Sequence, residues 1–179
     1  AILTNLEEGD VTKLNFKNDS IDVIIISGVL GFVDNHKDAI QEISRVLKPN
    51  GHALIIDFFY GEDKPNTELF KKLESRIGIN FERFDLNYWL KTFGTKELDI
   101  VGFESLNLKY RNLIDPQILV DNIVTKKKAK NQTISPEEIN TLKDNISVII
   151  ENFNYLNQGS FLLHKNESSL YANGQPSMN

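Results

Sequence analysis

The 179-residue sequence contains no cysteine, and only one methionine and one tryptophan. Without thiols the chain can form neither a disulfide framework nor a thiolate metal site. Its three histidines, His36, His52 and His164, are far apart in the sequence and lack the spacing of metal ligands. We therefore expect no metal centre.

Long hydrophobic runs are also missing. The longest, Val23 to Ile26 and Ala53 to Tyr60, have the length of strands and fall short of the ~20 residues that a membrane-spanning helix needs. The start of the chain, at Ala1, shows none of the charged and apolar regions of a signal peptide. These features predict a cytoplasmic protein that does not enter a membrane.

The charge pattern argues against nucleic acid as a partner. The net charge is -5, which gives no positive field to attract phosphates. The one basic cluster, Lys126 to Lys130, is interpreted as a solvated helix end. With 40% hydrophobic and 25% charged residues, the composition is typical of one globular domain.

A strand, helix, strand unit is predicted in the first third of the chain. Residues 21 to 27 form a short β-branched run followed by Gly28, as in a strand buried in a parallel sheet. Asp34 and Asn35 can cap a helix with apolar residues at helical spacing, which Pro49-Asn50-Gly51 ends. A second buried strand follows over residues 53 to 59, so we expect a right-handed crossover and parallel pairing.

The rest of the chain predicts helices and two further strands. We expect helices over residues 67–77, 85–93 and 115–128, the first of them capped by Asn66. A fourth helix is opened by the capping box Ser135-Pro136-Glu137-Glu138 and runs to about residue 152, and strands are expected over residues 103–110 and 160–165. The predicted fold class is α/β: a partial, doubly wound, Rossmann-like sheet, mostly parallel, with an antiparallel last strand and a helical insertion before it. The predicted domain covers residues 1–165 with the insertion at about 111–157, and residues 166–179 form a flexible tail.

An ordered series of short motifs over residues 9–59 resembles one known family. It comprises Gly9-Asp10-Val11, then Asp19-Ser20-Ile21-Asp22-Val23-Ile24, then Ser27-Gly28-Val29-Leu30, then Ile43-Ser44-Arg45-Val46-Leu47-Lys48-Pro49-Asn50-Gly51. The series is similar to the downstream motifs of class I S-adenosylmethionine-dependent methyltransferases of the small-molecule, type 11-like kind. Each piece alone is weak, but unrelated folds rarely produce the whole series.

The resemblance implies S-adenosyl-L-methionine as the cofactor and indicates which residues bind it. In this reading the Asp10 carboxylate accepts a hydrogen bond from the adenine amino group, and the Val11 amide faces a ring nitrogen. An acceptor-only side chain suits that donor. Ser27, Gly28 and Val29 then run along the methionine and ribose, where a small residue lets the backbone approach closely.

Other positions have less specific roles. The resemblance places Phe32, Asp57, Phe59 and Tyr60 beside the acceptor pocket; Asp57 is either a base or orienting group, or a solvated carboxylate at a strand end. Some relatives carry a histidine where this chain has Gly31 and Phe32, so the catalytic residue stays unknown. We interpret Asp22 as structural, and Arg45 and Lys48 as solvated side chains whose positive charge interacts favourably with the C-terminal end of the helix dipole.

One part of the family pattern is not found in the chain. A domain of this family starts with a strand, a turn of the G-x-G-x-G kind and a second strand ending in an acid that binds the ribose. We expect the parent chain or another chain to supply this half, and we expect the isolated chain to be inactive.

Two functions from different classes stay open. The first is methyl transfer to a small-molecule acceptor by the complete protein. The second is a non-catalytic interaction or scaffold domain that keeps the fold. A nicotinamide-dependent enzyme is disfavoured because no Tyr-x-x-x-Lys motif follows the central strands.

Overall fold

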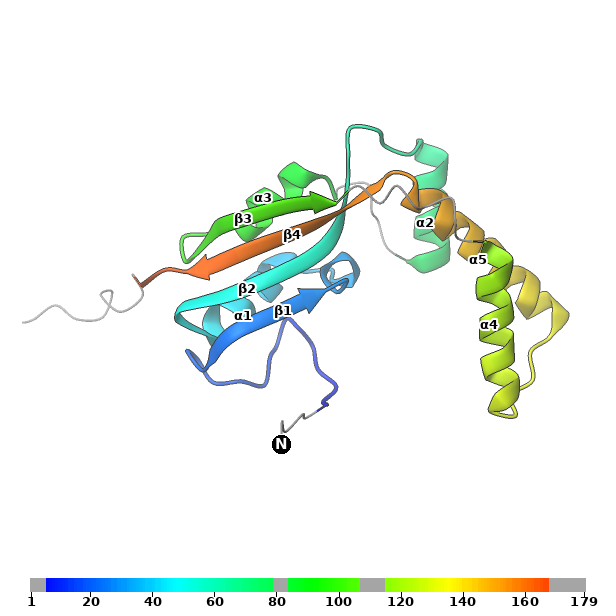
Figure 1. The fold of residues 1–179 in the computed structure, drawn as a ribbon, viewed down its shortest axis with the longest axis horizontal. Coiled ribbons are helices and arrows are strands. Elements are labelled where there is room, and N and C mark those ends of the chain that lie inside the picture. Colours follow the sequence, from blue (N-terminus) through cyan, green and yellow to red (C-terminus); the bar gives the residue numbers. More distant parts are fainter. Residues whose placement is uncertain (1–5, 79–83, 107–114, 168–179) are drawn as a thin grey trace, which may run out of the picture. The chain divides into compact units, whose positions relative to one another are not determined.

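The computed structural model describes residues 6–78, 84–106 and 115–167, which contain four strands and five α-helices. In chain order they are β1 (Ile21–Ser27), the 3-10 turn η1 (Leu30–Phe32), α1 (His36–Val46), β2 (Leu47–Tyr60), α2 (Thr67–Ile77), α3 (Leu86–Phe93), β3 (Leu98–Leu106), α4 (Pro116–Ala129), α5 (Pro136–Phe153) and β4 (Leu156–Lys165) (Figure 1). The strand order is β1-β2-β4-β3. β1 and β2 are parallel and the other pairs antiparallel, which confirms the predicted α/β class with an antiparallel last strand. Among the described strands only one of the three pairs is parallel, so the sheet is mixed where we predicted a mostly parallel one.

The predicted strand, helix, strand unit is confirmed. β1 has the predicted bounds, and it pairs in parallel with β2 in a register that sets Ile24 beside Ala53 and Ser27 beside Ile56. Asn35 caps α1, because its side chain accepts a hydrogen bond from the Asp38 amide at 3.2 Å. The apolar residues of α1 recur at helical spacing and are buried, so the helix packs through one face.

The predicted start of the second strand was wrong. β2 begins at Leu47 and includes the Pro49-Asn50-Gly51 segment that we expected to be a turn before the strand. Between the pairs Ile21–Leu47 and Val23–His52, β1 advances by two residues while β2 advances by five, so the extra residues form a bulge. Asn50 has a left-handed φ of 63° there. The Pro49-Asn50-Gly51 segment therefore does bend the chain, but within a continuous strand rather than before it.

The last two strands also begin earlier than predicted. β3 starts at Leu98 rather than Phe103, and β4 starts at Leu156 rather than Ser160. The opening of β4, Leu-Asn-Gln-Gly, has no apolar alternation, so the sequence pattern did not indicate a strand there. Residues 107–110 of the predicted strand lie outside the described residues.

The chain divides into two compact units. The first holds residues 1–57, 87–105 and 159–179, and its helices α1 and α3 lie on the same face of the sheet (Figure 1). Along β2 the residues facing these helices, such as Ala53 and Ile55, are buried, while their alternates are only half-buried. On the other face, Val23 and Ile25 of β1 are 60% and 69% exposed.

The second unit holds residues 58–86 and 106–158. Its helices form as predicted: Asn66 caps α2, and Ser135 and Glu138 form the capping box of α5. A small core joins Tyr60, Phe70 and Leu156, with partly buried aromatic residues around it. The predicted insertion at 111–157 therefore shares a core with residues 58–86, and both belong to one compact unit.

The bulge in β2 generates a stability prediction. A Cβ atom at Gly51 would lie 2.8 Å from the Lys48 carbonyl oxygen and 3.1 Å from that of Asp22. Backbone atoms cannot give way cheaply, so Gly51→Ala should lower the free energy of unfolding by about 1–3 kcal/mol. Gly9→Ala is the control, since a Cβ there meets nothing within 4 Å. Denaturant unfolding measures both, and equal stability of the two variants would contradict the prediction.

Candidate cofactor site

Three of the residues predicted to bind the cofactor, Ser27, Gly28 and Val29, lie at the carboxyl end of β1. Gly28 follows the strand with a left-handed φ of 62°, and its amide donates to the Ile56 carbonyl of β2 at 2.9 Å. A Cβ at Gly28 would meet nothing within 4 Å, so the backbone is approachable from outside. The glycine is required by its conformation, because L side chains are strained at this φ. Ser27 and Val29, on either side, are exposed.

A short turn continues from this strand end. η1 covers Leu30–Phe32, and Asp57 of β2 accepts a hydrogen bond from the Gly31 amide through Oδ2 at 3.2 Å. The sequence left open whether Asp57 was a solvated strand-end carboxylate. At 3% exposed it is not solvated, and it holds the turn against the neighbouring strand. The Gly31 amide is a donor of the kind that a buried carboxylate needs, and the role of Asp57 as a base or orienting group in the acceptor pocket stays a prediction.

Asp10 closes a turn of its own. Its Oδ1 accepts hydrogen bonds from the backbone amide and the hydroxyl of Thr12, both at 2.8 Å, and the Lys13 amide donates to the Asp10 carbonyl at 3.0 Å. The hydrogen bonds from Thr12, chiefly that from its backbone amide, lower the pKa of the Asp10 carboxyl. The side chain is therefore an ionised, exposed acceptor. Within the described ranges no hydrogen bond uses its Oδ2.

The segment that follows Asp10 is held by α1, which the sequence reasoning missed. The Arg45 guanidinium donates to the carbonyls of Leu14 and Phe16 at 3.0 and 2.8 Å and to the Asn18 side chain at 2.8 Å. It also pairs with both oxygens of Glu42 at 2.7 Å. The expectation that Arg45 only solvates the helix end was wrong, because five donors in a fixed fork can bind several carbonyls at once.

Glu42 completes this anchor. Its Oε2 accepts from the Leu14 amide at 2.9 Å as well as from Arg45. The Arg45 hydrogen bond is the main cause of a lowered pKa of the Glu42 carboxyl, and Glu42 in turn raises the pKa of Arg45. Lys48, by contrast, pairs only at the surface with Asp22, which agrees with a structural reading of Asp22.

The residues predicted to line the acceptor pocket differ in exposure. Phe32 is exposed, whereas Phe59 and Tyr60 are buried. The Tyr60 hydroxyl donates to the Asn152 side-chain oxygen at 2.7 Å, and its ring packs edge-on against Phe70. Burial raises the pKa of the Tyr60 hydroxyl, so this group stays protonated. The proposed contacts of these residues with an acceptor stay predictions.

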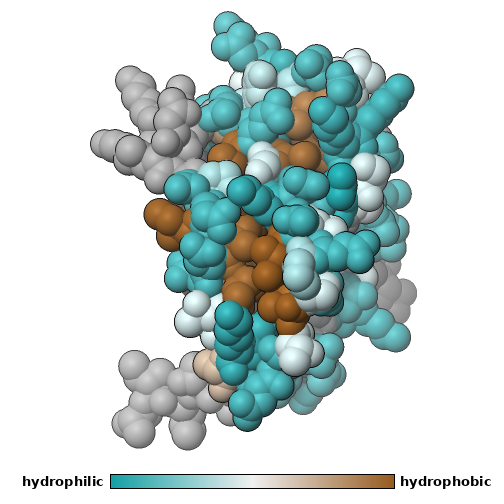
Figure 2. All heavy atoms as spheres, turned by 90° about the vertical axis from the view of Figure 1, so that its right-hand side faces the viewer, coloured by the Kyte–Doolittle hydropathy of each residue, from teal (hydrophilic) through white to brown (hydrophobic). Residues whose placement is uncertain are grey.

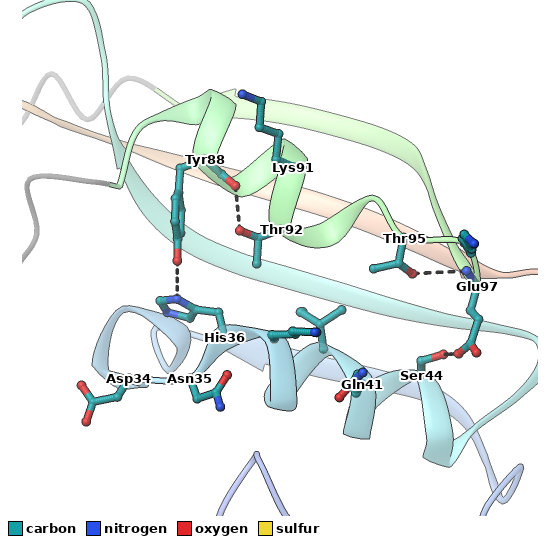
Figure 3. Close-up of a pocket in the computed structure, with 13 residues that line it drawn as sticks. Asp34, Asn35, His36, Gln41, Ser44, Tyr88, Lys91, Thr92, Thr95 and Glu97 are labelled. Atoms are coloured by element: carbon teal, nitrogen blue, oxygen red, sulfur yellow. Dashed lines mark hydrogen bonds between the residues drawn. The ribbon is translucent and has the colours of Figure 1, made fainter.

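A groove of about 900 Å³ lies between α1 and α3 (Figure 3). None of the residues predicted to bind the cofactor or acceptor lines it. In open α/β sheets ligands bind outside the carboxyl ends of the strands, so the groove is distinct from the cofactor site predicted at the end of β1, which stays a prediction. The groove does contain His36 and Tyr88, whose ring nitrogen and hydroxyl are 2.6 Å apart.

Comparison with known proteins agrees with the sequence resemblance. Residues 2–55 match the family model described as a methyltransferase domain. The chain is 38% identical over 65 residues to the ubiquinone/menaquinone biosynthesis C-methyltransferase UbiE of Stutzerimonas stutzeri, a match covering 36% of this chain and 24% of that relative. Residues 2–55 are therefore similar in sequence to methyltransferase domains, as the motif series indicated. It spans about a quarter of the length of the curated relatives that it matches.

Solved structures show the same fold. The MccD protein superposes with a TM-score of 0.68 at 17% identity, over 88% of this chain and 66% of that one. Phosphoethanolamine N-methyltransferase 2 of Haemonchus contortus, in complex with S-adenosyl-L-methionine, superposes with a TM-score of 0.59 at 17% identity, over 88% and 36% of the two chains. Among the described residues, no helix has the length and apolarity to cross a membrane.

The Arg45 anchor generates the second prediction. Arg45→Leu should release the segment after Asp10, because two carbonyls and the Asn18 side chain lose their charged donor. We expect amide exchange at Leu14 to accelerate roughly tenfold, measured by hydrogen–deuterium exchange. Lys48→Leu is the matched control, since it removes a neighbouring cation whose partner Asp22 is exposed. The same exchange rate in both variants would show that Arg45 does not hold the segment.

Proposed function

We propose that this chain, within its complete protein, binds S-adenosyl-L-methionine and serves methyl transfer to a small-molecule acceptor. The observation that best supports this function is the structure at the end of β1. There a Cβ atom at Gly28 would meet nothing within 4 Å, so a ligand can approach the backbone, and the buried Asp57 accepts a hydrogen bond from the following turn. The solved neighbour that holds S-adenosyl-L-methionine in the same fold supports this cofactor. The family match over residues 2–55 supports it independently, because that match includes Gly28 and the end of β1.

Asp10 is proposed to bind the adenine. Its Oδ1 is occupied by Thr12, and its ionised carboxylate keeps Oδ2 for a donor such as the adenine amino group. The Arg45 and Glu42 contacts stabilise the segment that follows, so the turn is pre-organised rather than ordered on binding. Val11 offers its backbone amide beside this carboxylate.

We further propose that the ribose and methionine are bound mainly by residues outside this chain. The β1 face that carries Val23 and Ile25 supports this, since a buried parallel strand normally has both faces covered. The adenine contacts alone then give weak affinity.

The chemistry requires little from side chains. When bound, the cofactor supplies a sulfonium methyl group for direct displacement by the acceptor. The chain's own contribution is alignment, which can account for ~7–11 kcal/mol of a barrier. Gly28 lets the backbone approach closely, and Asp57 orients the turn that bears Phe32. Tyr60 stays a neutral hydroxyl because burial raises its pKa.

The second unit is proposed to select the acceptor. It keeps apolar side chains at its surface on α4, where Ile118 is 59% and Leu119 39% exposed, and Figure 2 shows apolar surface on the side that carries α4 and α5. Exposed apolar residues in a small unit are typical of binding surfaces.

Replacing the apolar side chains of Ile118 and Leu119 by polar ones tests whether α4 helps to select the acceptor. In the complete protein, the double substitution Ile118→Ser and Leu119→Ser should raise the KM for the acceptor about tenfold and leave S-adenosylhomocysteine affinity unchanged, because the loss concerns one ligand only. Lys128→Ser, at the exposed end of α4, is the control. An unaltered acceptor KM would remove α4 from the acceptor site.

The adenine contact is tested by a pair of aspartates in the complete protein. Asp10→Ala should weaken S-adenosylhomocysteine binding by roughly tenfold or more, the usual effect of leaving a donor unpaired. Asp22→Ala should leave it nearly unchanged, because Asp22 pairs with Lys48 at the surface. Isothermal calorimetry measures both affinities, and the reverse order would refute the adenine assignment.

The same calorimetry decides between the two open functions. We expect the complete protein to bind S-adenosylhomocysteine and the 179-residue chain alone to bind it weakly or not at all. Absence of binding by the complete protein would favour the non-catalytic scaffold. Tight binding by the chain alone would show that its site is complete.

A further inference from the structure

The turn Leu30–Phe32 lies beside the predicted cofactor residues and has few hydrogen bonds of its own. Phe32 donates to the Val29 carbonyl and Val33 to the Leu30 carbonyl, both at 3.0 Å, and no side chain caps the turn. A single turn of this length is too short to be stable alone. Its conformation must therefore come from contacts outside it, of which Asp57 on Gly31 is one.

His36, in the first turn of α1, supplies a second contact. Its Nε2 lies 2.7 Å from the Leu30 carbonyl oxygen, and the side chain is buried. A carbonyl oxygen can only accept, so Nε2 carries the proton. The turn is thus held by two side chains: Asp57 accepts a hydrogen bond from the Gly31 amide, and His36 donates one to the Leu30 carbonyl.

Tyr88 of α3 sets the tautomer that this contact needs. Its hydroxyl lies 2.6 Å from Nδ1 of His36, and Figure 3 shows the tyrosine pointing from α3 to the histidine on α1. In a neutral imidazole with its proton on Nε2, Nδ1 is an acceptor, so the tyrosine donates. A donor at Nδ1 favours this tautomer and disfavours the one that would leave the Leu30 carbonyl without its histidine donor.

The rings themselves are held in place. His36 makes edge contacts with Tyr88 and with Trp89, at centroid distances of 5.6 and 5.1 Å. Trp89 is fully buried and stacks on Phe93 at 5.1 Å, so the aromatic cluster has little freedom to reorient. The pairing of His36 with Tyr88 is therefore part of a packed core rather than a surface encounter.

We propose that Tyr88 and His36 are positioning residues for the cofactor site: Tyr88 fixes the His36 tautomer, and His36 fixes the turn Leu30–Phe32 next to Gly28. The proposal rests on the proposed function, because the turn matters only if the end of β1 binds the cofactor. It assigns to α3 a role in the cofactor site that acts through His36, which is 52 residues from Tyr88 in the sequence.

Tyr88→Phe isolates the effect, because it removes one hydroxyl and keeps the ring contacts. In the complete protein it should weaken S-adenosylhomocysteine binding about threefold to tenfold, the range expected for one hydrogen bond. Ser44→Ala is the matched control: it removes another hydrogen bond between α1 and the segment after α3, from Ser44 to Glu97, at 2.5 Å. We expect similar losses of thermal stability in the two variants and weaker cofactor binding only in Tyr88→Phe.

A double-mutant cycle separates positioning from general stability. In His36→Gln the amide nitrogen is as many bonds from Cβ as Nε2 is, so it can donate to the Leu30 carbonyl and has no tautomer to select. This variant should retain affinity better than His36→Leu, and adding Tyr88→Phe to it should weaken binding by less than twofold (about the limit of such measurements). Nitrogen-15 NMR of the 179-residue chain should show His36 protonated at Nε2, and a tautomer mixture in Tyr88→Phe.

The outcomes are distinct. If the unsubstituted complete protein binds S-adenosylhomocysteine and Tyr88→Phe binds it equally well, the positioning role is refuted and the proposed function stands. Equal losses from Tyr88→Phe in the His36 and His36→Gln backgrounds would also refute it, since the tyrosine would then act independently. If the unsubstituted complete protein does not bind, the proposed function fails and the positioning role fails with it.

Discussion

The parallel register between β1 and β2 is the constraint on which the rest of the site depends. It sets Ser27 beside Ile56, so that the Gly28 amide reaches the Ile56 carbonyl and the chain leaves the sheet next to Asp57. A slip of one residue would turn Asp57 to the opposite face and leave the Gly31 amide without it. The bulge around Gly51 belongs to the same constraint, because it shifts the register after Leu47 to the one that the later pairs keep.

Helix α1 connects this strand end to the rest of the first unit. Its first turn holds η1 through His36, and its last turn holds the segment after Asp10 through Arg45 and Glu42. Two parts of the candidate site that are distant in sequence are thus tied to the two ends of one rigid element. This is an economical way to pre-organise a site made mostly of backbone groups, since the loops themselves contribute few contacts.

The second unit shows why the helical region at 111–157 is more than an addition to the sheet. Its core residues Phe153 and Leu156 pack with Tyr60 and Phe70, and the Tyr60 hydroxyl bonds Asn152. Removal of the helices would expose this core, so a role in acceptor choice is better tested by surface substitutions than by deletion. The similarity to known methyltransferases in sequence is concentrated in residues 2–55, while the fold similarity extends over most of the chain.

The sequence by itself determined the features that depend on local chemistry: β1 with its bounds, the caps Asn35, Asn66 and Ser135, and the family motifs of residues 9–59. Periodicity and capping act within a few residues, so they can be read without a partner. The tertiary structure alone decided that β2 continues through its turn signal, that Asp57 is buried, that Arg45 binds carbonyls some thirty residues away, and that Tyr88 meets His36. These contacts join groups far apart in the chain, and no local pattern encodes which distant carbonyl or hydroxyl a side chain will meet once the elements pack.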